Sequence, residues 1–181
     1  TSPMASPAGW GGTAGGQALT AMRLSALRQR LRDLGARPVH EHRVLQAWVR
    51  GRSLDKRHSP AEDFLPKAVR AAWPGLKAEL EELARVRSEH PDAAGAARLL
   101  VALHDGQTVE SVLLPRDGVC VSTQIGCAVG CRFCMTGQDG LLRQLGSAEI
   151  VAQVVLAQGR RPARPLKRVV FMGMGEPAHN L

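Results

Sequence analysis

The positions of apolar residues predict a helical first half for this chain. Apolar residues recur at helical spacing in two early stretches, and each stretch is followed by a glycine that can end a helix. These apolar positions are Leu24, Leu27, Leu31, Leu34, Val44, Leu45, Trp48 and Val49. Two more helical segments are predicted around 61–72 and 75–88, separated by Trp73-Pro74-Gly75. Together they predict a small helical N-terminal domain over residues 22–95.

The period of the pattern changes to that of strands near residue 98. Residues 98–103 and 108–114 are strand-like, and Asp105-Gly106 between them is a strong hairpin signal. These residues predict a β-hairpin and linker over 96–118, followed by another short strand at 119–125.

The rest of the pattern predicts one βαβ unit. Ser147 is a good N-cap for a helix, and Glu149 would face the positive end of its dipole. This helix is apolar on one side, and residues 167–172 after it are typical of a buried parallel strand. One such unit cannot close a barrel or bury both faces of a sheet. The predicted fold class is therefore α/β, with residues 119–181 as the start of a partial (β/α) barrel truncated after its second strand.

Composition and charge narrow the class of protein. Residues 1–21 carry no charge and are rich in Gly, Ala, Ser, Thr and Pro, which predicts a disordered leader. No apolar run reaches the roughly 18 residues of a membrane span, and no signal peptide is recognisable, so a soluble cytoplasmic protein is expected. The net charge of +8 favours polyanionic partners such as nucleic acid, although free use of Arg would also produce it.

The basic residues of the helical half allow two interpretations of equal weight. They form either an RNA-facing surface or ordinary solvated helix faces. The cluster comprises Arg23, Arg28, Arg30, Arg32, Arg37, Arg43, Arg50, Arg52, Lys56 and Arg57. Three Trp, three Phe and no Tyr argue against an extended platform of stacked bases in this portion.

Three cysteines carry the most specific chemical signal. Cys127, Cys131 and Cys134 have the spacing C-x3-C-x2-C, with an aromatic residue just before the last thiol. Three close thiolates can bind three corners of a four-iron cluster and leave one iron open to a small molecule. The rival interpretation is a structural zinc site with Cys120 as fourth ligand, but zinc sites usually show separated C-x2-C pairs. The spacing therefore favours an iron–sulfur cluster.

A second motif follows the predicted strand 167–172. It reads Gly173-Met174-Gly175-Glu176-Pro177, in which the glycines would let the backbone approach a ligand closely. Glu176 lies at the carboxyl end of a parallel strand, where α/β active sites form. Its carboxylate can accept hydrogen bonds from an ammonium group.

These motifs together resemble the radical S-adenosylmethionine (SAM) superfamily, and within it the RNA adenine methyltransferase family of the RlmN/Cfr type. The resemblance rests on Cys120–Cys127, the cysteine loop, Ser147–Val154 and Phe171–Pro177. It runs from about residue 22 to the end, and it is weak in the helical part and specific from residue 109 onward. It implies a [4Fe-4S] cluster and SAM as cofactors, and methylation of an adenine base in 23S rRNA or tRNA through a methyl-cysteine intermediate. It also implies a reducing electron donor such as a flavodoxin, no membrane partner, and a monomer at full length.

The resemblance assigns roles to particular residues. Cys127, Cys131 and Cys134 match the cluster ligands, and Gly175 and Glu176 match the SAM-contacting pair. Glu110 matches the family's proton acceptor. Cys120 matches the cysteine that releases the product by forming a disulfide. The methyl-carrying cysteine has no counterpart among these 181 residues, so this chain alone is predicted to be inactive.

Two departures from the family pattern leave the RNA target open. Met135-Thr136-Gly137 follows the last cysteine where many members have Ser-Thr-Ala, and Ala178-His179 replaces two apolar residues. The departures suggest a less characterised branch of the family and leave the ring carbon open as well. Two other functions are kept as alternatives: a radical SAM enzyme of another reaction type, and a zinc-containing nucleic-acid-binding module.

Overall fold

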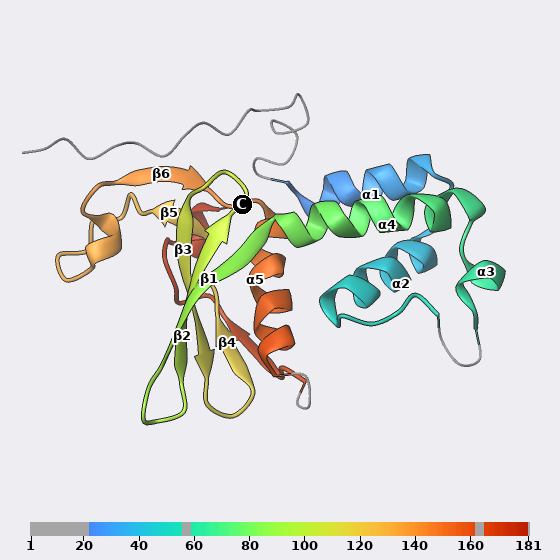
Figure 1. The fold of residues 1–181 in the computed structure, drawn as a ribbon. Coiled ribbons are helices and arrows are strands. Elements are labelled where there is room, and N and C mark those ends of the chain that lie inside the picture. Colours follow the sequence, from blue (N-terminus) through green and yellow to red (C-terminus); the bar gives the residue numbers. More distant parts are fainter. Residues whose placement is uncertain (1–21, 56–58, 162–164, 181) are drawn as a thin grey trace, which may run out of the picture.

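The computed structural model describes residues 22–55, 59–161 and 165–180. The predicted leader 1–21 lies outside the described residues. Figure 1 shows a group of helices from the first half of the chain beside a sheet that has one long helix packed against it. One continuous hydrophobic core joins the two parts.

Four helices form the first part: α1 (Leu24–Asp33), α2 (Pro38–Val49), α3 (Ala61–Phe64) and α4 (Lys67–Glu82). The predicted apolar spacing of α1 places Leu27 and Leu31 in the core. Pro38 occupies the first turn of α2, where its missing amide hydrogen leaves no bond unmade. The helical character of residues 24–49 is thus confirmed.

The sequence prediction was wrong on α4 and on the segment after this helix. The helix runs through Pro74 without a break, because Val69, Leu76 and Leu80 form a buried stripe that holds both of its halves. The helix then ends at Glu82, and Ala84–Pro91 forms strand β1 rather than a helix reaching residue 88. Pairing with β2 fixes this strand. The helical region therefore ends before residue 95.

Five strands form one mixed sheet in the order β1-β2-β3-β4-β7. The later members are β2 (Ala97–Leu103), β3 (Thr108–Leu114), β4 (Gly118–Cys120) and β7 (Arg168–Val170). The predicted hairpin is confirmed as β2 and β3, although it continues into β4 without the predicted boundary at residue 118. β4 and β7 are parallel neighbours, as the βαβ prediction requires. The single strand predicted over 119–125 is wrong, because these residues divide between β4 and a second strand, Gln124–Gly126, in a separate sheet. β7 itself is not buried as predicted, because it is the outer strand of the described sheet and Val169 remains 38% exposed.

Helix α5 (Ser147–Arg160) connects the two parallel strands and covers one face of the sheet. Ser147 is the first helical residue rather than the N-cap, and its hydroxyl accepts a hydrogen bond from the Leu24 amide at 2.8 Å. Gly146 occupies the cap, and its amide donates to Glu149 Oε2 at 2.7 Å. Glu149 thus serves the helix start as predicted, while Ser147 ties α5 to the helical part. No described helix is long and apolar enough to cross a membrane.

Candidate functional site

The cysteine loop is closed at its base by a short hairpin. Strands β5 (Gln124–Gly126) and β6 (Leu141–Gln144) pair antiparallel on either side of the loop. The Cys127 amide donates to the Gly140 carbonyl at 2.9 Å. Gly126 has φ +74°, and a Cβ there would lie 2.0 Å from the Gly140 oxygen. Only glycine fits this position, so close backbone packing helps to hold the two ends of the loop together.

The three predicted cluster ligands lie on this loop in different environments. Cys127 is buried, Cys134 is half-buried and Cys131 is exposed, and all four cysteines of the chain are free. A side-chain hydrogen bond with Thr136 holds the pKa of the Cys134 thiol below its usual value, which favours the thiolate that iron binds. Among the described residues, no three Cys, His, Asp or Glu side chains gather as a metal-binding set. The donors therefore suit a cluster in type, while the ligand assignment stays a prediction.

Glu110 and Cys120 lie on the face of the sheet opposite α5. Cys120 pairs with Val112, and alternation along β3 places Glu110 on that same face. Arg98 Nη1 lies 3.3 Å from Glu110 Oε1 in a half-exposed ion pair. Burial raises the pKa of the Cys120 thiol, partly opposed by a backbone hydrogen bond from Met172. The structure thus brings a carboxylate and a protonated thiol onto one face of neighbouring strands.

The Gly173–Pro177 turn packs against the segment that leads into the cysteine loop. A Cβ at Gly173 would lie 2.7 Å from the Val121 oxygen, and a Cβ at Gly175 would lie 2.5 Å from the Gln124 side chain. Both glycines are therefore required for close packing inside the protein. Glu176 Oε1 accepts the amide of Ala178 at 3.0 Å, so one carboxylate oxygen caps the short helix η3 (Pro177–His179).

Gln124 joins the Gly173–Pro177 turn to the β5–β6 hairpin at the base of the cysteine loop, called the cysteine hairpin below. Its Oε1 accepts the Glu176 amide at 2.8 Å, and its Nε2 donates to Gln144 Oε1 at 2.9 Å. The side chain of Gln124 is fully buried. The two motifs that the sequence singles out are therefore held next to each other through one amide group.

A second buried amide, Gln153 of α5, holds the backbone between Cys120 and the loop. Gln153 Oε1 accepts both the Ser122 amide at 2.9 Å and the Ser111 hydroxyl at 2.7 Å. Gln153 Nε2 donates to the Ser122 carbonyl at 2.9 Å. The Ser122 hydroxyl in turn donates to the Glu110 carbonyl at 2.5 Å and accepts the Met174 amide at 2.9 Å. Sequence reasoning did not assign a role to this residue, and its only signal was a polar side chain on the buried face of α5, one turn after Glu149.

A partly buried group of three charged side chains, Arg143, Glu149 and Asp105, supports the same region. Arg143 of β6 donates to both oxygens of Glu149 at 2.8–2.9 Å and lies 2.7 Å from Asp105 Oδ2. These bonds raise the pKa of Arg143, first through Glu149. They tie the cysteine hairpin to α5 and to the β2–β3 turn.

The sequence of this chain is similar to the sequences of known proteins. It is 71% identical over 160 residues to the "Probable RNA methyltransferase" of Azoarcus sp. (strain BH72), covering 88% of this chain and 45% of that protein. The protein of the same name from Thiobacillus denitrificans is 72% identical over 160 residues, with 88% and 43% covered. This chain thus spans somewhat less than half the length of the curated relatives it matches. No protein-family model matches it.

Among solved structures, the chain is similar to a radical SAM methyltransferase from Sphaerobacter thermophilus. The TM-score is 0.61 and the identity 36%, covering 88% of this chain and 47% of that one. The predicted resemblance to RNA methyltransferases is therefore confirmed, and so is the α/β class with its mixed sheet. The truncated barrel, the cytoplasmic location and the individual site residues stay predictions.

Proposed function

We propose that this chain forms part of a radical SAM methyltransferase that modifies an adenine base of rRNA or tRNA through a methyl-cysteine intermediate. One observation carries the proposal. The parallel neighbours β4 and β7 lead at their carboxyl ends to the cysteine loop and to the Gly173–Pro177 turn, and Gln124 bridges the two. Ligands of open α/β sheets bind at such strand ends. The names of the relatives support methyl transfer and RNA as substrate.

The residues at these strand ends would have two separate roles, binding of the cluster and binding of SAM. Cys127, Cys131 and Cys134 would hold a [4Fe-4S] cluster, which together with SAM supplies one-electron chemistry at carbon. The turn at Gly175 keeps the backbone close to Gln124 and fixes the direction of Glu176. Glu176 has one oxygen that caps η3, and the other can accept a hydrogen bond from the ammonium group of SAM.

Glu110 would act as a proton acceptor, and Cys120 would act in the release of the product. Glu110 would accept the proton that leaves the adenine ring, and the neighbouring Arg98 holds the direction of its carboxylate. Cys120 stays protonated through burial until a base takes its proton. Its disulfide partner would be the methyl-carrying cysteine outside these 181 residues. A reducing donor such as a flavodoxin, and a monomeric enzyme, belong to the same proposal.

Iron content of the chain tests the cluster. After reconstitution with iron and sulfide without oxygen, about four irons per chain and a broad brown absorbance are expected. Cys127→Ala, Cys131→Ala and Cys134→Ala should each lose most of the iron, whereas Cys120→Ala should keep it because that thiol lies outside the loop. One zinc per chain and no colour would overturn the cluster and favour a zinc-containing nucleic-acid-binding module.

RNA methylation tests the reaction in a protein that carries this chain at the length of its relatives. With SAM labelled in its methyl group and a reductant, labelled methyladenine is expected in digested RNA. Glu110→Gln should abolish it while iron content and SAM cleavage persist, because the carboxylate acts on the base rather than on SAM. SAM cleavage without any methylated adenine would instead favour a radical SAM enzyme of another reaction type.

A further inference from the structure

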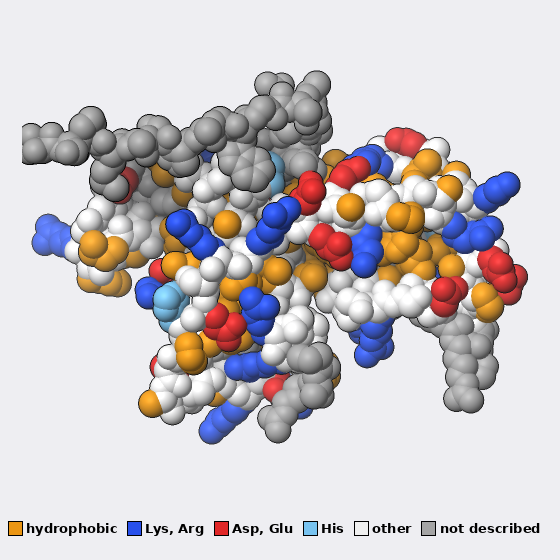
Figure 2. All heavy atoms as spheres, in the orientation of Figure 1, with side chains coloured by type: hydrophobic (Ala, Val, Ile, Leu, Met, Phe, Trp, Pro, Cys, Tyr) orange, Lys and Arg blue, Asp and Glu red, His pale blue; other side chains and the backbone are white. Residues whose placement is uncertain are grey.

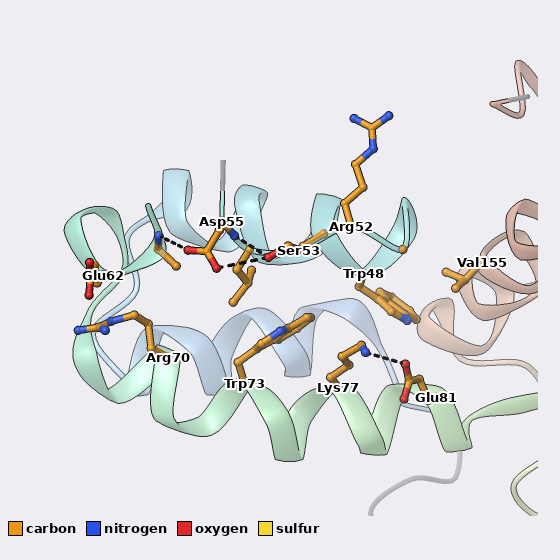
Figure 3. Close-up of a pocket in the computed structure, with 14 residues that line it drawn as sticks. Trp48, Arg52, Ser53, Asp55, Glu62, Arg70, Trp73, Lys77, Glu81 and Val155 are labelled. Atoms are coloured by element: carbon orange, nitrogen blue, oxygen red, sulfur yellow. Dashed lines mark hydrogen bonds and ion pairs between the residues drawn. The ribbon is translucent and has the colours of Figure 1, made fainter. Parts of the chain in front are cut away.

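A groove of about 840 Å³ lies among the helices of the first part (Figure 3). Its walls are α2 with residues 51–55 after it, α3 and α4, and Val155 of α5 closes one end. Because α5 covers one face of the sheet while Glu110 and Cys120 lie on the other, the groove is separate from the candidate site. None of the roles proposed above uses it.

One side of α4 presents two cations with an indole between them. Arg70, Trp73 and Lys77 are three and four positions apart, which places them on one helix face over roughly 10 Å. Figure 3 shows all three directed from α4 into the groove. Such an alternation matches the repeat of a nucleic-acid strand, in which each base is flanked by phosphates.

Arg70 lacks a partner for part of its guanidinium. Its Nε is buried and has no hydrogen-bond partner in the described part of the chain. A buried donor without an acceptor is unfavourable, so a rotation of this half-buried side chain that lets Nε donate to a phosphate oxygen in the groove would be favoured by a charge-assisted bond. Lys77 lies 3.2 Å from Glu81, but both side chains are more than half exposed. A pair of this kind is weak enough for a phosphate to replace the carboxylate.

The other charged residues of the groove leave its centre open. Asp55 is engaged, because its Oδ1 accepts the Ala61 amide at 2.9 Å. Arg52 points away from the groove in Figure 3, and Glu62 stands exposed on α3 at the rim. Trp73 is only half-buried, so its ring can stack on a ligand. Figure 2 shows the same helical part as a surface on which Lys and Arg side chains stand among apolar ones.

We propose that this groove binds a nucleotide of a single-stranded RNA segment, with its base stacked on Trp73 and its flanking phosphates paired with Arg70 and Lys77. The proposal rests on the proposed function in taking RNA as the partner. It adds a second contact, away from the reacting adenine, that would hold the substrate by its backbone and one base. One stacking residue is consistent with the scarcity of aromatic residues in the chain.

Binding of a single-stranded RNA decamer to the chain tests the groove. Anisotropy of the labelled RNA gives the affinity at several salt concentrations, and quenching of tryptophan fluorescence reports stacking. Trp73→Ala should weaken binding roughly 5- to 100-fold, which is the usual loss for one stacked base. Trp73→Phe should retain most of the affinity because a ring remains. Arg70→Gln should lower the slope of log affinity against log salt by about 0.7, as expected for one phosphate contact on a single strand.

Arg87→Gln is the matched control, because Arg87 lies on β1 outside the groove. Its affinity should stay within about twofold of wild type, and circular dichroism should show that every variant is folded. Unchanged affinity in both Trp73→Ala and Arg70→Gln would overturn the proposal, as would tryptophan-dependent self-association without RNA binding. SAM cleavage without RNA, measured in a protein that carries this chain at the length of its relatives, tests the proposed function alone. If the unaltered protein cleaves SAM but does not bind the RNA decamer, the groove is rejected and the proposed enzyme is not.

Discussion

Replacing Gln153 should destabilise the protein far more than an ordinary substitution on a helix. Gln153→Met keeps the helix propensity and the length of the side chain, but it leaves the Ser122 amide, the Ser122 carbonyl and the Ser111 hydroxyl without partners. Both serines are buried. At about 1–3 kcal/mol for each unsatisfied buried group, with some relaxation, the free energy of unfolding should fall by about 3–5 kcal/mol. That is a large share of the roughly 5–15 kcal/mol typical of a domain.

Urea unfolding followed by circular dichroism measures this loss, and a double-mutant cycle isolates its origin. Ser111→Ala alone should lower the free energy of unfolding by about 1 kcal/mol, whereas in the Gln153→Met background it should recover about 1 kcal/mol, because it removes a buried hydroxyl that has lost its partner. Alkylation of Cys120 in the native state should speed up in Gln153→Met, since the segment after this thiol loses its anchor. Gln46→Met on α2 is the control and should change stability by less than about 0.5 kcal/mol. A loss below about 1 kcal/mol in Gln153→Met, or additive effects in the cycle, would refute the reasoning.

Three further predictions concern the cysteine loop, the ion pair between Arg32 and the buried Glu41, and the Cys120 thiol. Gly126→Ala should lower the free energy of unfolding in urea by at least about 2 kcal/mol and should lower the iron content after reconstitution, because Gly126 has a left-handed backbone and the added Cβ would lie 2.0 Å from the Gly140 oxygen. Gly130→Ala is the control, because φ is also positive there but no atom lies near the added Cβ, and it should cost only about 1–2 kcal/mol. Hydrogen bonding from Arg32 lowers the pKa of Glu41, so its stabilisation is present above the unfolded pKa near 4.5 and is lost as pH falls through the lower folded value. Unfolding at pH 7 should therefore show Glu41→Gln about 1–2 kcal/mol less stable than wild type, and the gap should close in acid; a gap independent of pH would contradict this assignment. Burial raises the pKa of the Cys120 thiol. The rate of its alkylation, followed by mass spectrometry, should therefore reach half its limiting value at a higher pH in the folded protein than in the urea-unfolded protein. Equal midpoints in the two states would contradict the raised pKa.

The features that could be predicted well from the sequence are those determined by a few residues that lie close together in the chain. Asp105-Gly106 marks a hairpin because a turn of this kind needs a residue that tolerates positive φ, and Gly106 has φ +83°. The cysteine spacing and the Gly173–Pro177 turn are equally local, and the structure holds these two motifs next to each other. The α/β order of strand, loop, helix and parallel strand followed from periodicity alone.

The features that sequence reasoning missed depend on partners far away in the chain. Residues 84–91 become a strand only because β2 offers a paired edge, and without that edge their pattern is ambiguous. The helix through Pro74 survives because packing along its whole length outweighs the missing amide hydrogen. Gln124 and Gln153 bond to groups 52 and 31 positions away, so nothing near them in the sequence indicates their role.

The closed base of the cysteine loop should let this part of the protein fold without bound metal. Zinc fingers depend on their metal for folding, whereas here the β5–β6 pairing and the contact between Gly126 and Gly140 need no metal. If the loop holds the proposed cluster, loss of the iron would therefore leave the β5–β6 base of the loop paired. The apoprotein could then take up iron again without refolding this hairpin first.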